Sequence, residues 1–216
     1  MSTTIEIRSR WDATRVLYGT EIDDSVPSGL RMRAALERAT QARANLAGAY
    51  LAGAYLAGAY LARANLADAN LARADLARAN LAGADLAGAD LARADLAGAD
   101  LAGANLARAD LAGAYLAGAY LAGDKKLKLI GPRPVLTIGP IGSRADTLIA
   151  FITDAGIRVR AGCFFDTLDL FKAAVDETHG SNEHGREYAA AIVMIEAHAS
   201  LFGVDVATAA EKVVTE

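Results

Sequence analysis

A leucine recurs at every fifth residue from Leu46 to Leu121, without a break, in a chain of 216 residues. A step of five residues turns an α-helix by about 500°, so successive leucines would point about 140° apart and would form no apolar stripe. An odd period also moves the leucine to the opposite face of a flat strand at each repeat. The period therefore excludes an ordinary amphipathic helix and an ordinary flat strand for this segment.

The remaining solution is a solenoid, in which each five-residue unit forms one short side followed by a turn. Leucine and the alanine two residues before it are predicted to point inward, and the other three positions outward. Successive coils would stack at the roughly 4.8 Å spacing of paired strands, so that backbone amides bond to the coils on either side. A narrow interior would explain why the inward positions hold only alanine and leucine.

The units Ala-Asn-Leu-Ala-Gly, Ala-Asp-Leu-Ala-Arg and Ala-Tyr-Leu-Ala-Gly follow an A(D/N)LxX pattern, and this segment resembles the pentapeptide-repeat family. The resemblance covers residues 44–123 in register and extends back to about residue 34 with degenerate units. It implies a mainly β fold, a right-handed quadrilateral β-helix with four units per coil. Sixteen units would then make about four coils.

Four units per coil would stack residues that lie twenty apart in the sequence. The central position of the unit then forms four columns, with tyrosines in the first and last coils and aspartates in the third. The columns are Asn45, Asn65, Asp85 and Asn105; Tyr50, Asn70, Asp90 and Asp110; Tyr55, Asp75, Asp95 and Tyr115; and Tyr60, Asn80, Asp100 and Tyr120. An arginine two residues before an aspartate is expected to form a solvated ladder of salt bridges, in the pairs Arg73–Asp75, Arg93–Asp95 and Arg108–Asp110.

The segment before the repeats, residues 1–43, is predicted to cap the open edge of the first coil. The run from Ile5 indicates two strands around a short turn, and the run from Ser28 indicates a helix that begins near Pro27. The apolar residues expected to line one side of this helix are Leu30, Met32, Ala35, Leu36 and Ala39.

Residues 124–216 are predicted to form a C-terminal α+β capping domain, because the composition changes abruptly after Gly123. Thr147–Thr153 and Ile157–Gly162 are the expected strands of a hairpin. Helices are expected after Asp166 or Thr167, over Glu183–Phe202 and after Asp205. The stretches "IRVRAGCFFDTLDLF" and "ETHGSNEHGREYAAAI" resemble those of phage and prophage pentapeptide proteins, which implies this architecture and no particular activity.

Composition and side-chain chemistry argue against a catalytic or nucleic-acid-binding protein. The net charge is −4 and is spread evenly, so no basic surface is indicated. The sequence shows neither a signal peptide nor a membrane span, and the protein is expected in the cytoplasm, with the resemblance implying a phage association. Cys163, His179 and His184 are weak metal candidates without paired-cysteine spacing. No cofactor and no enzymatic activity are therefore expected, and a zinc-binding or enzymatic C-terminal domain is the less favoured alternative.

The sequence favours a rigid scaffold for protein–protein contact or self-assembly, with homo-oligomerisation through the C-terminal helices. The alternative is a DNA mimic that binds DNA gyrase or topoisomerase, as some members of the family do. Residues 44–123 carry a net charge of only −2, however, and leucine where those proteins usually carry phenylalanine. The protein partner is not identified, and contact with nucleic acid or membrane is not expected. The expected interaction surface comprises Tyr50, Tyr55, Tyr60, Asp85, Asp90, Asp95, Asp100, Tyr115, Tyr120, Tyr188, Ile192 and Ile195.

Overall fold

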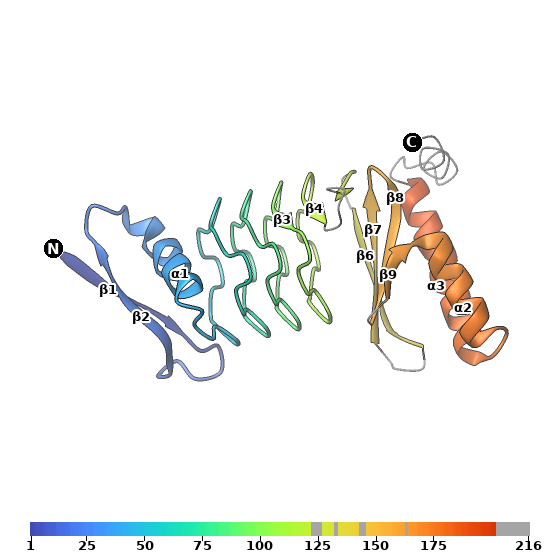
Figure 1. Cartoon of the computed structure of the whole chain (residues 1–216), viewed down its shortest axis with the longest axis horizontal. Coiled ribbons are helices and arrows are strands. Elements are labelled where there is room, and N and C mark those ends of the chain that lie inside the picture. Colours follow the sequence, from blue (N-terminus) through green and yellow to red (C-terminus); the bar gives the residue numbers. More distant parts are fainter. Residues whose placement is uncertain (122–126, 132–133, 143–145, 163, 202–216) are drawn as a thin grey trace. The chain divides into compact units, whose positions relative to one another are not determined.

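The computed structural model describes residues 1–121, 127–131, 134–142, 146–162 and 164–201 (Figure 1). The chain divides into two compact units, Met1–Lys126 and Leu127–Glu216. Within the described residues, the first unit contains a hairpin and a helix followed by the repeats, and the second contains a sheet and two helices.

The repeats form a stack of coils in which each central residue pairs in parallel with the residue twenty positions later (Figure 1). The strands β3 (Asp100–Leu101) and β4 (Tyr120–Leu121) are the most regular of these pairs. Each side is held by alternating amide bonds; for example, Leu51 N donates to Asn70 O and Asn70 N donates to Ala49 O, both at 2.8 Å. All four predicted columns are present, and the segment is a β-solenoid.

The interior of the solenoid is built from the two positions that the sequence predicts. All sixteen leucines from Leu46 to Leu121 are buried, with between 0% and 7% of their surface exposed. Most of the alanines two residues before them are also buried, whereas Ala44, Ala54 and Ala114 are half-buried. Because every coil repeats the same pair, the core is a continuous column of leucine and alanine.

The position two residues after each leucine forms the turn, and its backbone is left-handed. From residue 48 to residue 118, φ at this position lies between 54° and 71°. The turn is closed by a bond such as that from Ala49 N to Leu46 O, at 3.0 Å. Glycine adopts this conformation freely, as at Gly53, whereas a side chain there, as at Arg73, carries a conformational cost of about 1 kcal/mol or more. The turn therefore explains why this slot so often holds glycine.

The N-terminal segment contains the predicted hairpin and helix. Strands β1 (Ser2–Arg8) and β2 (Val16–Asp23) are antiparallel, and a 3-10 turn, η1 (Ser28–Leu30), leads into α1 (Arg31–Gln41). Side chains of both elements form a small core that is fully buried: Ile7, Ile22, Ala35, Leu36 and Ala39. Leu30 departs from the prediction and is exposed, because it lies in the 3-10 turn before the helix.

The second unit is a four-stranded antiparallel sheet in the order β6-β7-β8-β9, with both helices on one face (Figure 1). Its core joins residues of the central strands, such as Leu148 and Val159, to Phe171, Val175 and Ile195 of the helices. The short strand β5 (Leu127–Lys128) lies beside the end of β7, where Asp154 N donates to Lys128 O at 3.0 Å. The other elements are β6 (Val135–Ile141), β7 (Asp146–Thr153), β8 (Gly156–Ala161), β9 (Phe164–Thr167), α2 (Leu168–His179) and α3 (Glu183–Leu201).

Much of this unit agrees with the sequence-based expectations. The hairpin β7–β8 is confirmed, although its turn is shorter than expected because Thr153 pairs directly with Gly156. The N-cap of α2 is Thr167, whose hydroxyl accepts from Leu170 N, and Gly180 ends the helix. Strands β6 and β9 were not predicted. The short helix expected after Asp205 lies outside the described residues.

Candidate interaction surface

The asparagines and aspartates of the central column position have a structural role. In all eleven of these residues within the solenoid, the side-chain Oδ1 accepts the backbone N–H of the residue two positions later, as in the 3.1 Å bond from Ala77 N to Asp75. Such a bond closes the bend between two sides, which is the reason that short Asx side chains suit this slot. In the first column, Asn65 and Asn105 also donate to Asn45 and Asp85 in the preceding coil, at 3.0 Å.

The aspartates of the third coil do not form a single acidic patch. Asp85, Asp90, Asp95 and Asp100 belong to four different columns of the stack. Each carboxylate is also held by the amide two residues later. The structure thus gives these acids a turn-forming role and distributes their charge around the solenoid.

The expected ladder of salt bridges is wrong for two of its three pairs. Among the described residues, neither Arg73 nor Arg93 forms an ion pair with the aspartate two positions later. The stems of such arginines lie against the next coil instead: the Cγ of Arg93 is 3.4 Å from the position that a Cβ would take at Gly113. The aliphatic parts of these side chains therefore cover the corresponding turn of the next coil.

The tyrosines of the central position cannot form the side-chain bond of the Asx residues, and most of them are exposed. In the first coil the exposed fractions are 55% for Tyr50, 65% for Tyr55 and 69% for Tyr60, and in the last coil 52% for Tyr115. Tyr120 is half-buried. These aromatic side chains occupy a position where asparagine or aspartate would stabilise the turn through a side-chain hydrogen bond. The tyrosines therefore depart from the pattern that the other central residues of the solenoid follow.

Trp11 adds a further aromatic ring at the same end of the solenoid. It is exposed, and its ring lies over Gly48, where a Cβ would come within 1.9 Å of it. The guanidinium of Arg10 lies 6.0 Å from the ring centroid. The first coil and the loop beside it therefore carry four exposed aromatic side chains, which we call the aromatic end: Trp11, Tyr50, Tyr55 and Tyr60. The three tyrosines belong to three different columns, so these rings are distributed around the end of the solenoid and do not share one face.

Replacing Tyr55 with asparagine should stabilise the solenoid by about 1 kcal/mol, the typical net contribution of one hydrogen bond, because asparagine can accept the amide of residue 57. Urea unfolding followed by circular dichroism measures this change. The control is Tyr55→Val, which also removes the ring but cannot accept the bond. Equal stability of the two variants would show that the tyrosine position forms no Asx turn.

The helical residues predicted for an interaction surface lie mainly in the core. Ile195 is fully buried against the sheet, which corrects its assignment to a surface. Tyr188 is half-buried, with its ring centroid 5.7 Å from that of Phe171, and Ile192 is also half-buried. The large exposed apolar residues of α3 are instead Val193, Met194 and Leu201, which were not predicted.

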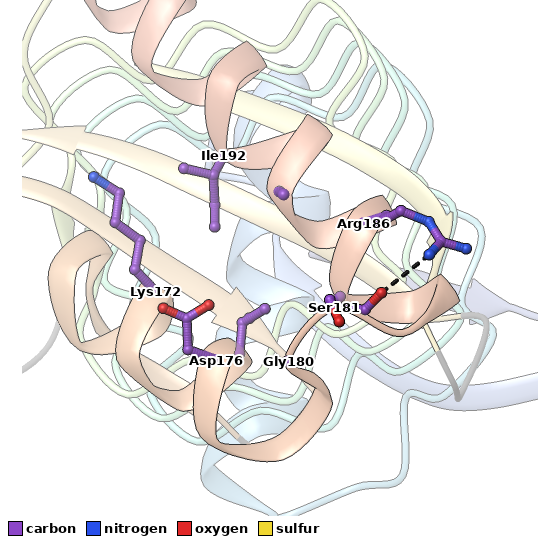
Figure 2. Close-up of a pocket in the computed structure, with 9 residues that line it drawn as sticks. Lys172, Asp176, Gly180, Ser181, Arg186 and Ile192 are labelled. Carbon is purple, nitrogen blue, oxygen red and sulfur yellow. Dashed lines mark hydrogen bonds between the residues drawn. The ribbon is translucent and has the colours of Figure 1, made fainter.

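A shallow pocket of about 360 Å³ lies between α2 and α3 near their connection (Figure 2). Lys172 Nζ is bonded to Glu196 Oε1 at 2.6 Å, and this bond raises the pKa of Lys172 above its ordinary value. Arg186 donates to Ser181 O at 3.0 Å. Both cations of the pocket are therefore already engaged by the protein.

The metal candidates are only partly placed by the structure. Cys163 lies outside the described residues. The ring centroids of His179 and His184 are 6.0 Å apart with their planes inclined by 74°, and His184 Nδ1 lies 3.4 Å from Glu187 Oε2. Within the described residues no group of three or more His, Cys, Asp or Glu side chains could hold a metal ion. No helix in the same part of the chain is both long and apolar enough to cross a membrane.

Comparisons with known proteins identify the repeats. The family described as "Pentapeptide repeats (8 copies)" matches residues 44–81, 74–110 and 89–123. No curated protein matches the chain.

Solved structures of pentapeptide repeat proteins are also similar to the chain. One from the thylakoid lumen of Arabidopsis thaliana is 39% identical, with 37% of this chain and 55% of that chain covered and a TM-score of 0.36. The match thus spans little more than half of that protein. One from Nostoc is 41% identical over 41% of this chain and 78% of that chain, with a TM-score of 0.37. With this identity and coverage, and with the family match to the repeats, the chain belongs to the pentapeptide-repeat family.

Proposed function

We propose that this protein is a non-catalytic scaffold whose solenoid, a right-handed quadrilateral β-helix of about four coils, presents fixed side chains to a protein partner. The observation that carries the proposal is the aromatic end. Its three tyrosines occupy a position where asparagine or aspartate would form a turn-stabilising bond, and they remain exposed. Residues that break a local rule of the fold are frequently functional, and exposed tyrosine and tryptophan are typical anchors of protein interfaces.

The construction of the solenoid suits a rigid support. The leucine column is buried throughout, and every side is bonded to the coil above or below. Side chains that project from such a lattice keep their spacing when a partner binds. Binding then costs little conformational entropy, which favours affinity.

We infer that the N-terminal segment is one cap of this scaffold. Backbone groups of β1 and the following loop bond to one side of the first coil, from Tyr50 N to Arg8 O and from Arg10 N to Gly48 O. On another side, Arg33 donates to Ala57 O at 2.7 Å and to Gly58 O at 3.1 Å. These contacts satisfy edge groups that would otherwise be open to another strand. The C-terminal domain as the second cap stays a prediction.

Arg33→Ala should destabilise the first unit by about 2 kcal/mol, because two carbonyl groups of the first coil lose a charged donor. Glu37, which pairs with Arg33 and accepts from Tyr60 N, would also lose its counter-ion. Urea unfolding monitored by the fluorescence of Trp11, the only tryptophan, measures the loss. Arg43→Ala, at the end of the same segment, is the matched control and should change stability by less than about 0.5 kcal/mol.

Site-specific photocrosslinking in the native host tests the scaffold proposal. A photoreactive phenylalanine analogue at Tyr55 or Tyr60 should form crosslinks to one defined protein. The control places the same analogue at Asp95, which is exposed and lies in the same column as Tyr55, two coils away. Equal crosslinking from all three positions, or none from the tyrosines, would contradict a binding role for the aromatic end.

A DNA mimic that binds gyrase or topoisomerase is the second candidate, favoured by the ring of four aspartates in the third coil. Inhibition of DNA supercoiling by gyrase is its measurement. The variant with asparagine at Asp85, Asp90, Asp95 and Asp100 retains the turn-forming oxygens and should abolish the inhibition. For a zinc-binding or enzymatic C-terminal domain, the least favoured candidate, metal analysis of the purified protein is the corresponding test.

A further inference from the structure

Helix α3 is apolar on both of its long faces. Ala191, Ile195 and Ala199 face the core of the unit and are buried. Between Tyr188 and Leu201, Glu196 is the only acidic or permanently charged side chain, and it is bonded to Lys172. A helix that is apolar all round is usually buried on all sides.

The outer face of α3 is nevertheless exposed. Val193, Met194 and Leu201 have 65%, 53% and 80% of their surface exposed, and Ala190 and Ala197 are exposed as well. At 100° per residue these five side chains fall within a sector about 100° wide, opposite the buried face. We call them the α3 stripe.

The α3 stripe has a symmetric order of residue sizes. Two large side chains, Val193 and Met194, lie midway along it, one at each edge, with an alanine three residues beyond each of them, at 190 and 197. When two such helices cross antiparallel about the point between Val193 and Met194, each alanine meets the other alanine of the second helix. A two-fold interface requires such a self-complementary surface, in which residue i contacts j and j contacts i.

We propose that the α3 stripe is a self-association surface, on which a second copy of this chain packs its own α3 antiparallel. Alanine opposite alanine lets the helices approach closely at two points, and between these points Val193 and Met194 pack on either side of the crossing. At each end of this interface, the aliphatic stem of Arg186 from one copy covers Leu201 of the other copy. The guanidinium of Arg186 then lies at the solvated rim of the interface. The surface is independent of the partner that the solenoid binds.

Sedimentation equilibrium of the full chain tests this proposal. The expected mass is twice the 22.4 kDa of one chain. The double variant Val193→Glu, Met194→Glu should raise the dimer dissociation constant at least about a hundredfold, because it would bury unpaired carboxylates. The matched control, Leu170→Glu with Ala173→Glu, makes the same charge change at exposed positions of α2 and should leave the dimer intact.

Disulfide trapping tests the register, in a Cys163→Ser background. Met194→Cys should crosslink two chains because the position lies at the two-fold axis. Ala190→Cys should not, because residues 190 of the two copies would lie about 10 Å apart along the helices. A monomeric full chain, or a dimer that the double glutamate variant does not weaken, would overturn the proposal. The proposal would also be overturned if a chain that ends at Leu201 formed dimers and the full chain did not. In that case the occupant of the stripe would be residues 202–216.

Discussion

Replacing Leu76 with alanine should lower the free energy of unfolding of the first unit by about 3 kcal/mol, within the range measured for buried leucines. Leu76 is fully buried in the middle of the solenoid, and its amide is bonded to Asp95 O at 2.7 Å. The coils above and below are fixed by similar bonds, so the surrounding structure cannot collapse into the cavity. Urea unfolding followed by Trp11 fluorescence and by circular dichroism measures the loss.

Leu30→Ala is the matched control for this prediction, since it removes the same atoms from an exposed side chain of the same unit. Its expected effect is below about 0.5 kcal/mol, as for other surface substitutions. A similar loss in both variants would mean that the leucine column does not limit the stability of the solenoid.

Gly185→Ala should destabilise the second unit by about 3 kcal/mol. Gly185 lies in the first turn of α3, where a Cβ would come within 2.0 Å of Gly180 O, a backbone atom that cannot move aside as a side chain can. The connection between α2 and α3 would have to open, with loss of the bond from Gly185 N to Asn182 Oδ1. Hydrogen exchange read by mass spectrometry should show protection of both helices reduced about a hundredfold.

Peptides from the solenoid provide the internal control in the same experiment, and their exchange should not change. A second control is Gly29→Ala, because a Cβ at Gly29 meets no atom within 4 Å. Unchanged protection of α2 and α3 in Gly185→Ala would show that the two helices are not held by this close approach.

The architecture of the repeats could be predicted from the sequence because a single constraint recurs in every unit. Because the leucine must point inward at each fifth residue, the inward position of the alanine and the outward positions of the other three residues could be predicted as well. The turn-forming role of the Asx side chains could not be predicted in this way, since the sequence alone indicates only the charge of residues such as Asp85 and Asp95. Their bonds to the amides two residues later depend on the bend of the backbone, which the period does not specify.

The second unit shows where sequence patterns lose information. Strand β6 contains Gly139 and Pro140, which usually mark loops, but an edge strand with an irregular register can accommodate them. Strand β9 has only four residues directly before a helix. For α3, apolar residues occur on every face, so helical spacing alone could not separate the buried Ile195 from the exposed Val193 and Met194.

The difference between a unit of five residues and a stacking register of twenty has an evolutionary consequence. Loss of one five-residue unit between coils would preserve every turn and every inward leucine, so the chain would still fold. It would nevertheless move Tyr115 out of the column of Tyr55 and shift every later side chain to the neighbouring column. Duplications of twenty residues lengthen the surface unchanged, whereas duplications of five rearrange it. Copy-number change within the repetitive gene segment can thus create new surface patterns without any substitution.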